Sequence, residues 1–154
     1  MESPEALLLF DDVMVGSVLS STEPYLVTAD EIKEVARRFD PMPFHLDEAS
    51  AEASHFGGLV ASGAHTIAVS IRLGSLEMPR TAAIAGLGID ELRFLAPMRP
   101  GDALTQTTEI VETIPSRSRP DAGILRGRRS LRNQHGVEVM TYVVTWMVAR
   151  AVAH

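Results

Sequence analysis

The segment LVASGAHTIAVSIRL, residues 59–73, belongs to the longest apolar stretch of the 154-residue chain, Gly57 to Leu73. It is too long for a typical strand, is rich in small residues and is apolar on nearly every side. A helix of this composition is buried on most of its surface. We therefore expect a buried central helix that starts near Gly63 and is ended by Pro79.

The residues on the N-terminal side predict a strand followed by a helix. Val18 to Val27 has the pattern of a strand. Thr28 and Glu31 form a capping box, in which the Thr28 hydroxyl accepts the Glu31 amide and the Glu31 carboxylate reaches back. The apolar stripe from Ile32 to Phe39 has helical spacing, and Pro41 stops that helix.

The remaining pattern predicts one more short helix and a meander of long strands. Asp47 can cap a helix over Glu48 to Ser54. The strands expected after Pro79 are Thr81 to Ala96, Ala103 to Ile114, Ile124 to Leu131 and Val137 to Val148. Antiparallel strands wrapped around one helix would bury that helix economically. The fold class predicted is α+β.

Composition limits the classes of protein that the chain can represent. Its length suits one compact domain, so we expect residues 1–154 to form a single domain. With no cysteine, it can hold neither a disulfide nor a thiolate metal site. The acidic start of the chain does not resemble a secretory signal, and no apolar stretch is long enough to span a membrane. We expect a cytoplasmic protein.

Charge is unevenly distributed along the chain. The net charge of -6 argues against a general nucleic-acid binder, but six arginines lie between Arg117 and Arg132. Such a cluster could bind an anion, for example the phosphates of coenzyme A, or it could be the solvated face of a hairpin. Arg126 and Arg128 share one face of a strand by their spacing, and Arg129 lies on the other.

The segment FDPMPFHLD, residues 39–47, carries the clearest chemistry. Its two prolines exclude a helix and hold the backbone between Asp40 and His45 in an extended or turn conformation. A carboxylate and an imidazole presented from a rigid loop can together orient and deprotonate a water molecule. The same residues could instead be a helix cap and a hydrogen-bonded loop histidine.

Gly63 is a second candidate, because it lies where the buried helix is expected to begin. The first amides of a helix have no internal acceptor, so the Gly63 amide could bind a developing enolate oxygen. The alternative is that a glycine permits tight packing of the helix.

The other candidate residues give weaker evidence of function. His65, two residues further along this helix, is more typical of a satisfied buried polar group than of a catalytic residue. The histidines lack zinc-ligand spacing, so no metal site is expected. Ser62 and Gly63 do not belong to a serine-hydrolase elbow.

Taken together, Asp40, Pro43, His45 and Asp47, with Gly63 eighteen residues after His45, resemble the MaoC-like dehydratases, which include the (R)-specific enoyl-CoA hydratases. The segment FLAPMRPGD, residues 94–102, resembles the strand–turn–strand junction of the same family. The resemblance extends over most of the chain, from about Phe10 to about Val148.

The resemblance implies a hot-dog fold, with a long antiparallel sheet curled around a helix from Gly63 to about Met78. It implies that Asp40 and His45 activate water for addition to a 2-enoyl thioester, or act in the reverse dehydration, and that the Gly63 amide holds the carbonyl oxygen. It requires no metal or redox cofactor, since coenzyme A enters with the substrate. It also implies a homodimer or higher homo-oligomer.

Three positions depart from the family pattern. Met42 stands where the hydratases commonly have asparagine, Ser62 where they often have histidine, and Ile71 where they often have a helix serine. Ser70 is adjacent to that last position, but one residue along a helix rotates a side chain by about 100°. Altered support around the Asp40–His45 pair can reduce activity or change substrate preference.

Two other functions are compatible with the same fold. One is hydrolysis of an acyl-CoA thioester, which does not need the Asp40–His45 pair. The other is a non-catalytic subunit that binds an acyl thioester, in which Met42 and Ile71 mark a decayed site.

Overall fold

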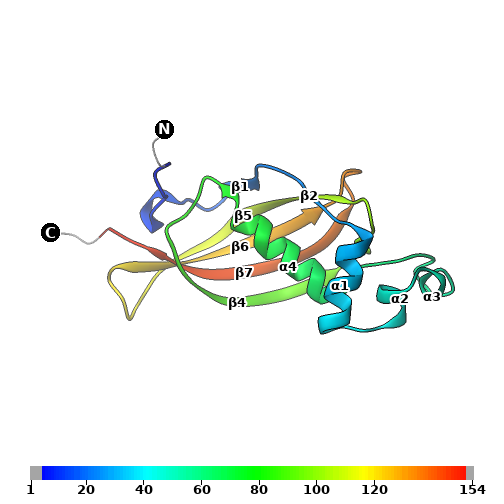
Figure 1. Cartoon of the computed structure of the whole chain (residues 1–154). Coiled ribbons are helices and arrows are strands. Elements are labelled where there is room, and N and C mark those ends of the chain that lie inside the picture. The colour runs from blue at the N-terminus through cyan, green and yellow to red at the C-terminus, as the bar shows by residue number, and fades with distance from the viewer. Residues whose placement is uncertain (1–4, 152–154) are drawn as a thin grey trace.

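A computed structural model describes residues 5–151, and it is built on one curved antiparallel sheet (Figure 1). The strand order is β3-β1-β5-β6-β7-β4, and β2 also pairs with β5. The strands are β1 (Val18–Ser21), β2 (Tyr25–Leu26), β3 (Glu77–Met78), β4 (Ala83–Phe94), β5 (Ala103–Pro115), β6 (Ala122–Arg132) and β7 (Glu138–Ala149). The four predicted long strands are therefore confirmed, but only β5, β6 and β7 form a meander, because β4 pairs with β7 and not with β5. The strand expected over Val18 to Val27 is split in two.

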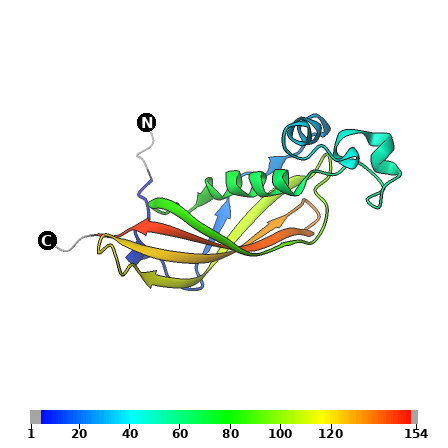
Figure 2. The same ribbon diagram turned by 90° about the horizontal axis from the view of Figure 1, so that it is seen from below.

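Helix α4 (Gly63–Gly74) lies across one face of this sheet, as Figures 1 and 2 both show. The predicted α+β architecture, a sheet around a helix, is confirmed. The helix is shorter than expected, because it ends at Gly74 and the chain then forms β3, which pairs with β1. Pro79 therefore follows a strand and does not end the helix.

The buried side of α4 is more polar than the sequence pattern suggested. Val69 and Leu73 are buried there, but so are His65, Thr66 and Ser70. By contrast, Ile71 is 54% exposed. The prediction of a helix that is apolar and covered on nearly every side is wrong in these two respects.

The other helices gather at one end of the sheet (Figure 2). They are α1 (Ala29–Phe39), α2 (Pro43–Leu46) and α3 (Glu48–Glu52), while a 3-10 turn, η1 (Phe10–Asp12), precedes β1. The prolines were expected to exclude a helix, yet α2 forms a single turn with Pro43 at its start. Proline is tolerated there because the first amides of a helix need no internal acceptor.

Two predicted helix caps are present, and one of them differs in detail. Asp47 accepts the Ser50 amide at the start of α3, as expected. Thr28 accepts the Glu31 amide at the start of α1. The Glu31 carboxylate does not complete the capping box, because it accepts the Tyr25 hydroxyl instead.

Within residues 5–151 there is no helix with the length and apolar character needed to cross a membrane. Most of the acidic start of the chain, on which the expectation about a secretory signal depends, lies outside the described residues.

Candidate active site

Asp40 and His45 face each other at the junction of α1 and α2. Asp40 is the C-cap of α1, and His45 lies within the single turn of α2. Their side chains approach to 3.4 Å between Asp40 Oδ2 and His45 Nε2. The imidazole is buried, whereas the carboxylate is 38% exposed. The pair predicted from the sequence is thus brought together, with its carboxylate open to solvent.

The backbone of the neighbouring segment fixes the orientation of His45. The Val60 carbonyl oxygen lies 2.6 Å from His45 Nδ1, and a carbonyl can only accept a hydrogen bond. Nδ1 therefore carries hydrogen, and in a neutral imidazole Nε2 is an acceptor that faces Asp40. Phe44 packs edge-on against the imidazole at 4.5 Å between ring centroids.

The 97–102 turn supports this segment from the other side. Ala61 donates its amide to the Met98 carbonyl at 2.8 Å, and Met98 is buried. The turn itself is closed by the Asp102 carboxylate, which accepts the Arg99 amide, and by Gly101, whose φ is +87°. The motif that resembles a family junction therefore holds the extended segment that carries Val60, just before α4.

Gly63 is the first residue of α4, as predicted. The Ser62 side chain caps the helix by accepting the His65 amide. Among residues 5–151, no acceptor is bonded to the Gly63 amide. A Cβ atom at this position would lie only 2.8 Å from Phe94 Cζ. Both interpretations of Gly63, a free amide and a close packing contact, are thus compatible with the geometry.

A cavity of about 580 Å³ joins His45 and Gly63. Its walls are largely apolar and include Phe44, Phe56 and Phe94. Arg99 also lines it and donates from Nη2 to the Phe56 carbonyl at 2.8 Å. Asp40 lies beside His45 but outside the lining of this cavity. The site can therefore hold an apolar substrate against an imidazole, a helix amide and a cation.

The three departures from the family pattern have structural counterparts. Met42 is 46% exposed, Ser62 is the buried cap of α4, and Ile71 is exposed on that helix. Ser70 points to the sheet, where its hydroxyl bonds Gln106 and Tyr142. It does not replace the missing serine at position 71, as the rotation argument predicted.

A partly buried polar group that was not predicted from the sequence connects β2, α1 and α4 through Tyr25, Glu31 and His65. His65 is 2% exposed, and neither ring nitrogen has a hydrogen-bond partner among the described residues. Its Nε2 lies 3.3 Å from Glu31 Oε1, without the geometry of a hydrogen bond. The bond from Tyr25 to Glu31 raises the pKa of Tyr25 to about 12, helped by burial and by the Glu31 charge. The sequence pointed to Glu31 only as part of the predicted capping box with Thr28, which the Glu31 carboxylate does not complete.

An antiparallel sheet wrapped around one helix is the hot-dog fold. A Mycobacterium tuberculosis protein with a double hot-dog fold superimposes with a TM-score of 0.81 at 20% identity, covering 96% of this chain and 46% of that chain. The MaoC like domain matches residues 13–124. This chain therefore belongs to the MaoC-like dehydratase family.

Individual relatives agree with that assignment. The chain is 32% identical to the uncharacterized protein YdeM of Bacillus subtilis, over 91% of this chain and 98% of that protein. It is 28% identical to a 3-hydroxybutyryl-CoA dehydratase of Methylorubrum extorquens, over 73% and 70% of the two chains. The crystal structure of a MaoC-like dehydratase from Rhodospirillum rubrum, 40% identical, has a TM-score of 0.87 and covers 95% of this chain and 99% of that one.

Proposed function

We propose that this protein is a hydratase/dehydratase that adds water to a 2-enoyl-CoA thioester, or removes it from a 3-hydroxyacyl-CoA. The observation that carries the proposal is the approach of Asp40 Oδ2 to His45 Nε2, next to a cavity that His45 and Gly63 both line. Family membership and the 3-hydroxybutyryl-CoA dehydratase relative support this reaction class.

The first step uses the paired acceptors. With Nδ1 bonded to Val60, both His45 Nε2 and the Asp40 carboxylate can accept hydrogen from one water molecule. As the water oxygen bonds to the β-carbon of the thioester, one of its protons passes to this pair. The electrons of the double bond then move toward the carbonyl oxygen.

The second step needs a donor for that oxygen. The Gly63 amide, at the positive end of the α4 dipole, binds the enolate oxygen as charge develops on it. The proton held by the Asp40–His45 pair then passes to the α-carbon, which completes the addition of water. Coenzyme A takes part only as the carrier of the acyl group, and Arg99 offers a guanidinium to its anionic part.

The protein also has a surface suited to self-association, and we infer a homodimer through β4. This strand is an edge of the sheet and is exposed along nearly its whole length. It carries the exposed apolar residues Ile84, Leu87, Ile89 and Phe94. A long apolar edge of this kind favours pairing with another strand.

The reaction is tested by following the enoyl-thioester absorbance of crotonyl-CoA and of longer and branched enoyl-CoAs. The wild type is expected to consume at least one of them. Asp40→Asn and His45→Ala should each lower kcat about 100-fold or more, because each removes an acid–base group. Asp47→Asn is the matched control, since this carboxylate of the same segment caps α3 and does not face His45.

The alternatives give different results in the same experiment. Release of free thiol from a saturated acyl-CoA would identify a thioesterase. Stabilisation by enoyl-CoA thioesters without any turnover would identify a binding subunit. Full activity in Asp40→Asn would show that the mechanism proposed here is wrong.

A further inference from the structure

His65 is the one buried side chain among residues 5–151 whose polar atoms lack a hydrogen-bond partner. It lies on the first turn of α4, two residues after Gly63, and is 2% exposed. Within the same residues, neither Nδ1 nor Nε2 is bonded. A buried polar group without a partner destabilises the folded state, because it has lost its hydrogen bonds to water. A reason other than stability is therefore needed for a histidine at this position.

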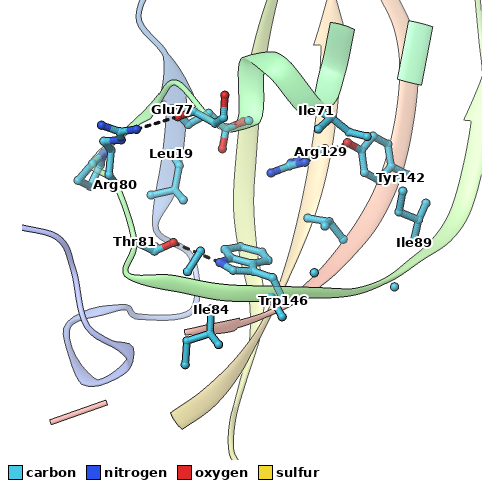
Figure 3. A pocket seen from close by; sticks show the side chains of 18 residues that line it. Leu19, Ile71, Glu77, Arg80, Thr81, Ile84, Ile89, Arg129, Tyr142 and Trp146 are labelled. Carbon is cyan, nitrogen blue, oxygen red and sulfur yellow. Dashed lines mark hydrogen bonds between the residues drawn. The ribbon is translucent and has the colours of Figure 1, made fainter. Parts of the chain in front are cut away.

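The other buried polar side chains of α4 are bonded. The Thr66 hydroxyl donates to the carbonyl oxygen four residues earlier at 3.0 Å. Ser70 bonds Tyr142 at 2.7 Å, and Tyr142 also accepts from Arg129 Nη1 at 3.0 Å. Tyr142 and Arg129 line a second cavity, of about 870 Å³, further along α4 (Figure 3). The unbonded ring of His65 is thus an exception on this helix.

Glu31 on α1 lies within reach of the His65 ring. Its Oε1 is 3.3 Å from His65 Nε2, so a small rotation of the ring would let an Nε2–H donate to it. The same oxygen accepts the Tyr25 hydroxyl, which holds the carboxylate in place. A carboxylate oxygen has room for two donors. Among the described residues, no hydrogen bond or other ion pair joins α1 to α4.

The two helices that meet at this contact carry different parts of the candidate active site. Helix α1 ends at Asp40, and the first turn of α4 presents the Gly63 amide. His65 belongs to that turn, since its own amide is bonded by the side chain that caps α4. A bond from the His65 ring to Glu31 would therefore fix the Gly63 amide relative to the Asp40 carboxylate.

We propose that His65 is a positioning residue for the hydratase reaction, with Nε2–H donating to Glu31 Oε1 when the substrate is bound. This bond sets the Gly63 amide against the water held by Asp40 and His45, where a displacement of about 1 Å can cost about 100-fold in rate. The imidazole thus lowers the stability of the free protein and raises the rate of the reaction. The inference rests on the proposed function and adds a residue outside the lining of the His45 cavity.

His65→Leu tests this role, because leucine has a similar volume and no polar atoms. We expect the melting temperature to rise by about 2–4 °C, since the unbonded nitrogens are removed and leucine favours a helix. In the same variant kcat for an enoyl-CoA should fall about tenfold, with KM changed by no more than about twofold. A purely structural role would lower both stability and activity.

His65→Gln is the rescue variant, because its amide donor lies near the position of Nε2, and it should keep about half of the wild-type kcat or more. His135→Leu is the matched control. His135 is exposed in the turn between β6 and β7, so neither the melting temperature nor kcat should change.

A double variant tests whether His65 acts through Glu31. In Glu31→Ala the acceptor is already absent, so adding His65→Leu should cause no further loss of kcat. The proposal would be overturned if His65→Leu kept the wild-type kcat, if it melted at a lower temperature, or if its full effect on kcat persisted in Glu31→Ala. A wild type that turns over no enoyl-CoA would instead overturn the hydratase function, and the positioning role with it. The two failures are therefore distinguished by the activity of the wild type.

Discussion

At the level of single residues, the backbone contributes as much to the site as the side chains do. His45 is oriented by the Val60 carbonyl, and the proposed oxyanion donor is the amide of Gly63. The position of Gly63 could be predicted from the sequence, whereas the Val60 carbonyl is a backbone group that no motif singles out. The spacing of Asp40 and His45 was enough to predict that their side chains face each other, and Gly63 lines one cavity with His45. The partner that orients the imidazole, and the Phe94 ring against Gly63, became visible only through contacts between distant segments.

Gly63→Ala tests the packing contribution of this glycine. The new Cβ would lie 2.8 Å from Phe94 Cζ, so one of the two must move. We expect the free energy of unfolding, as measured by urea denaturation, to fall by about 1 kcal/mol, because the ring tip of the 54% exposed Phe94 can give way more easily than a core side chain. Adding Phe94→Ala should relieve the clash that the alanine causes.

The control for that measurement is Gly86→Ala, where a Cβ meets nothing within 4 Å. A Gly63→Ala protein as stable as this control would contradict the packing argument. Activity of the double variant then separates the two roles of Gly63, because the amide is kept while the clash is removed.

At the level of elements, α1 and α4 are joined by a small, partly buried polar group. Glu31 on α1 accepts the Tyr25 hydroxyl and lies beside His65 on α4. The same two helices present Asp40 at the C-terminal end of α1 and Gly63 at the N-terminal end of α4. The contact therefore helps to set the relative position of the two halves of the site.

The pKa of Tyr25 depends on its hydrogen bond to Glu31, so its ionisation can be used to test this contact. The bond to Glu31, with burial and the Glu31 charge, raises the pKa of Tyr25 to about 12 from an ordinary value near 10. The folded protein thus holds the phenol proton more tightly than the unfolded chain does. The resulting stabilisation is complete below about pH 10 and is lost as the pH rises from about 10 to about 12.

The absorbance of tyrosinate, taken as the difference between wild type and Tyr25→Phe, measures that ionisation directly. In Glu31→Gln the difference signal should appear closer to pH 10, because the charge and the strongest acceptor are removed together. If the pH midpoint of Tyr25 ionisation were unchanged in Glu31→Gln, the hydrogen bond to Glu31 would not be the cause of the raised pKa.

The elements also show where sequence patterns reach their limit. The long strands and both caps were predictable, because period-two alternation and cap residues are local signals. The one-turn helix α2 was not, since a proline that breaks a helix interior is allowed at its first position. The end of α4 at Gly74 was missed for a different reason. The pairing of β3 with β1 is a long-range contact that leaves no mark in the helix itself.

At the level of the whole molecule, the two edges of the sheet differ. One edge is β3, which has two residues, and the other is the twelve-residue β4 (Figure 1). A short edge offers few unpaired backbone groups, whereas β4 offers a long row flanked by apolar side chains. The asymmetry predicts that a second copy pairs with β4 and not with β3.

Leu87→Lys tests that prediction, because Leu87 is 50% exposed on β4 and lies outside the lining of both cavities. A lysine at the same point of two paired edges would place like charges close together and leave them poorly hydrated. We expect light scattering after gel filtration to give the mass of a dimer for the wild type and of a monomer for the variant. Met14→Lys is the matched control, since Met14 is 71% exposed and lies before β1, outside strand β4. A Leu87→Lys protein that keeps the dimer mass, or a Met14→Lys protein that loses it, would place the interface elsewhere on the molecule.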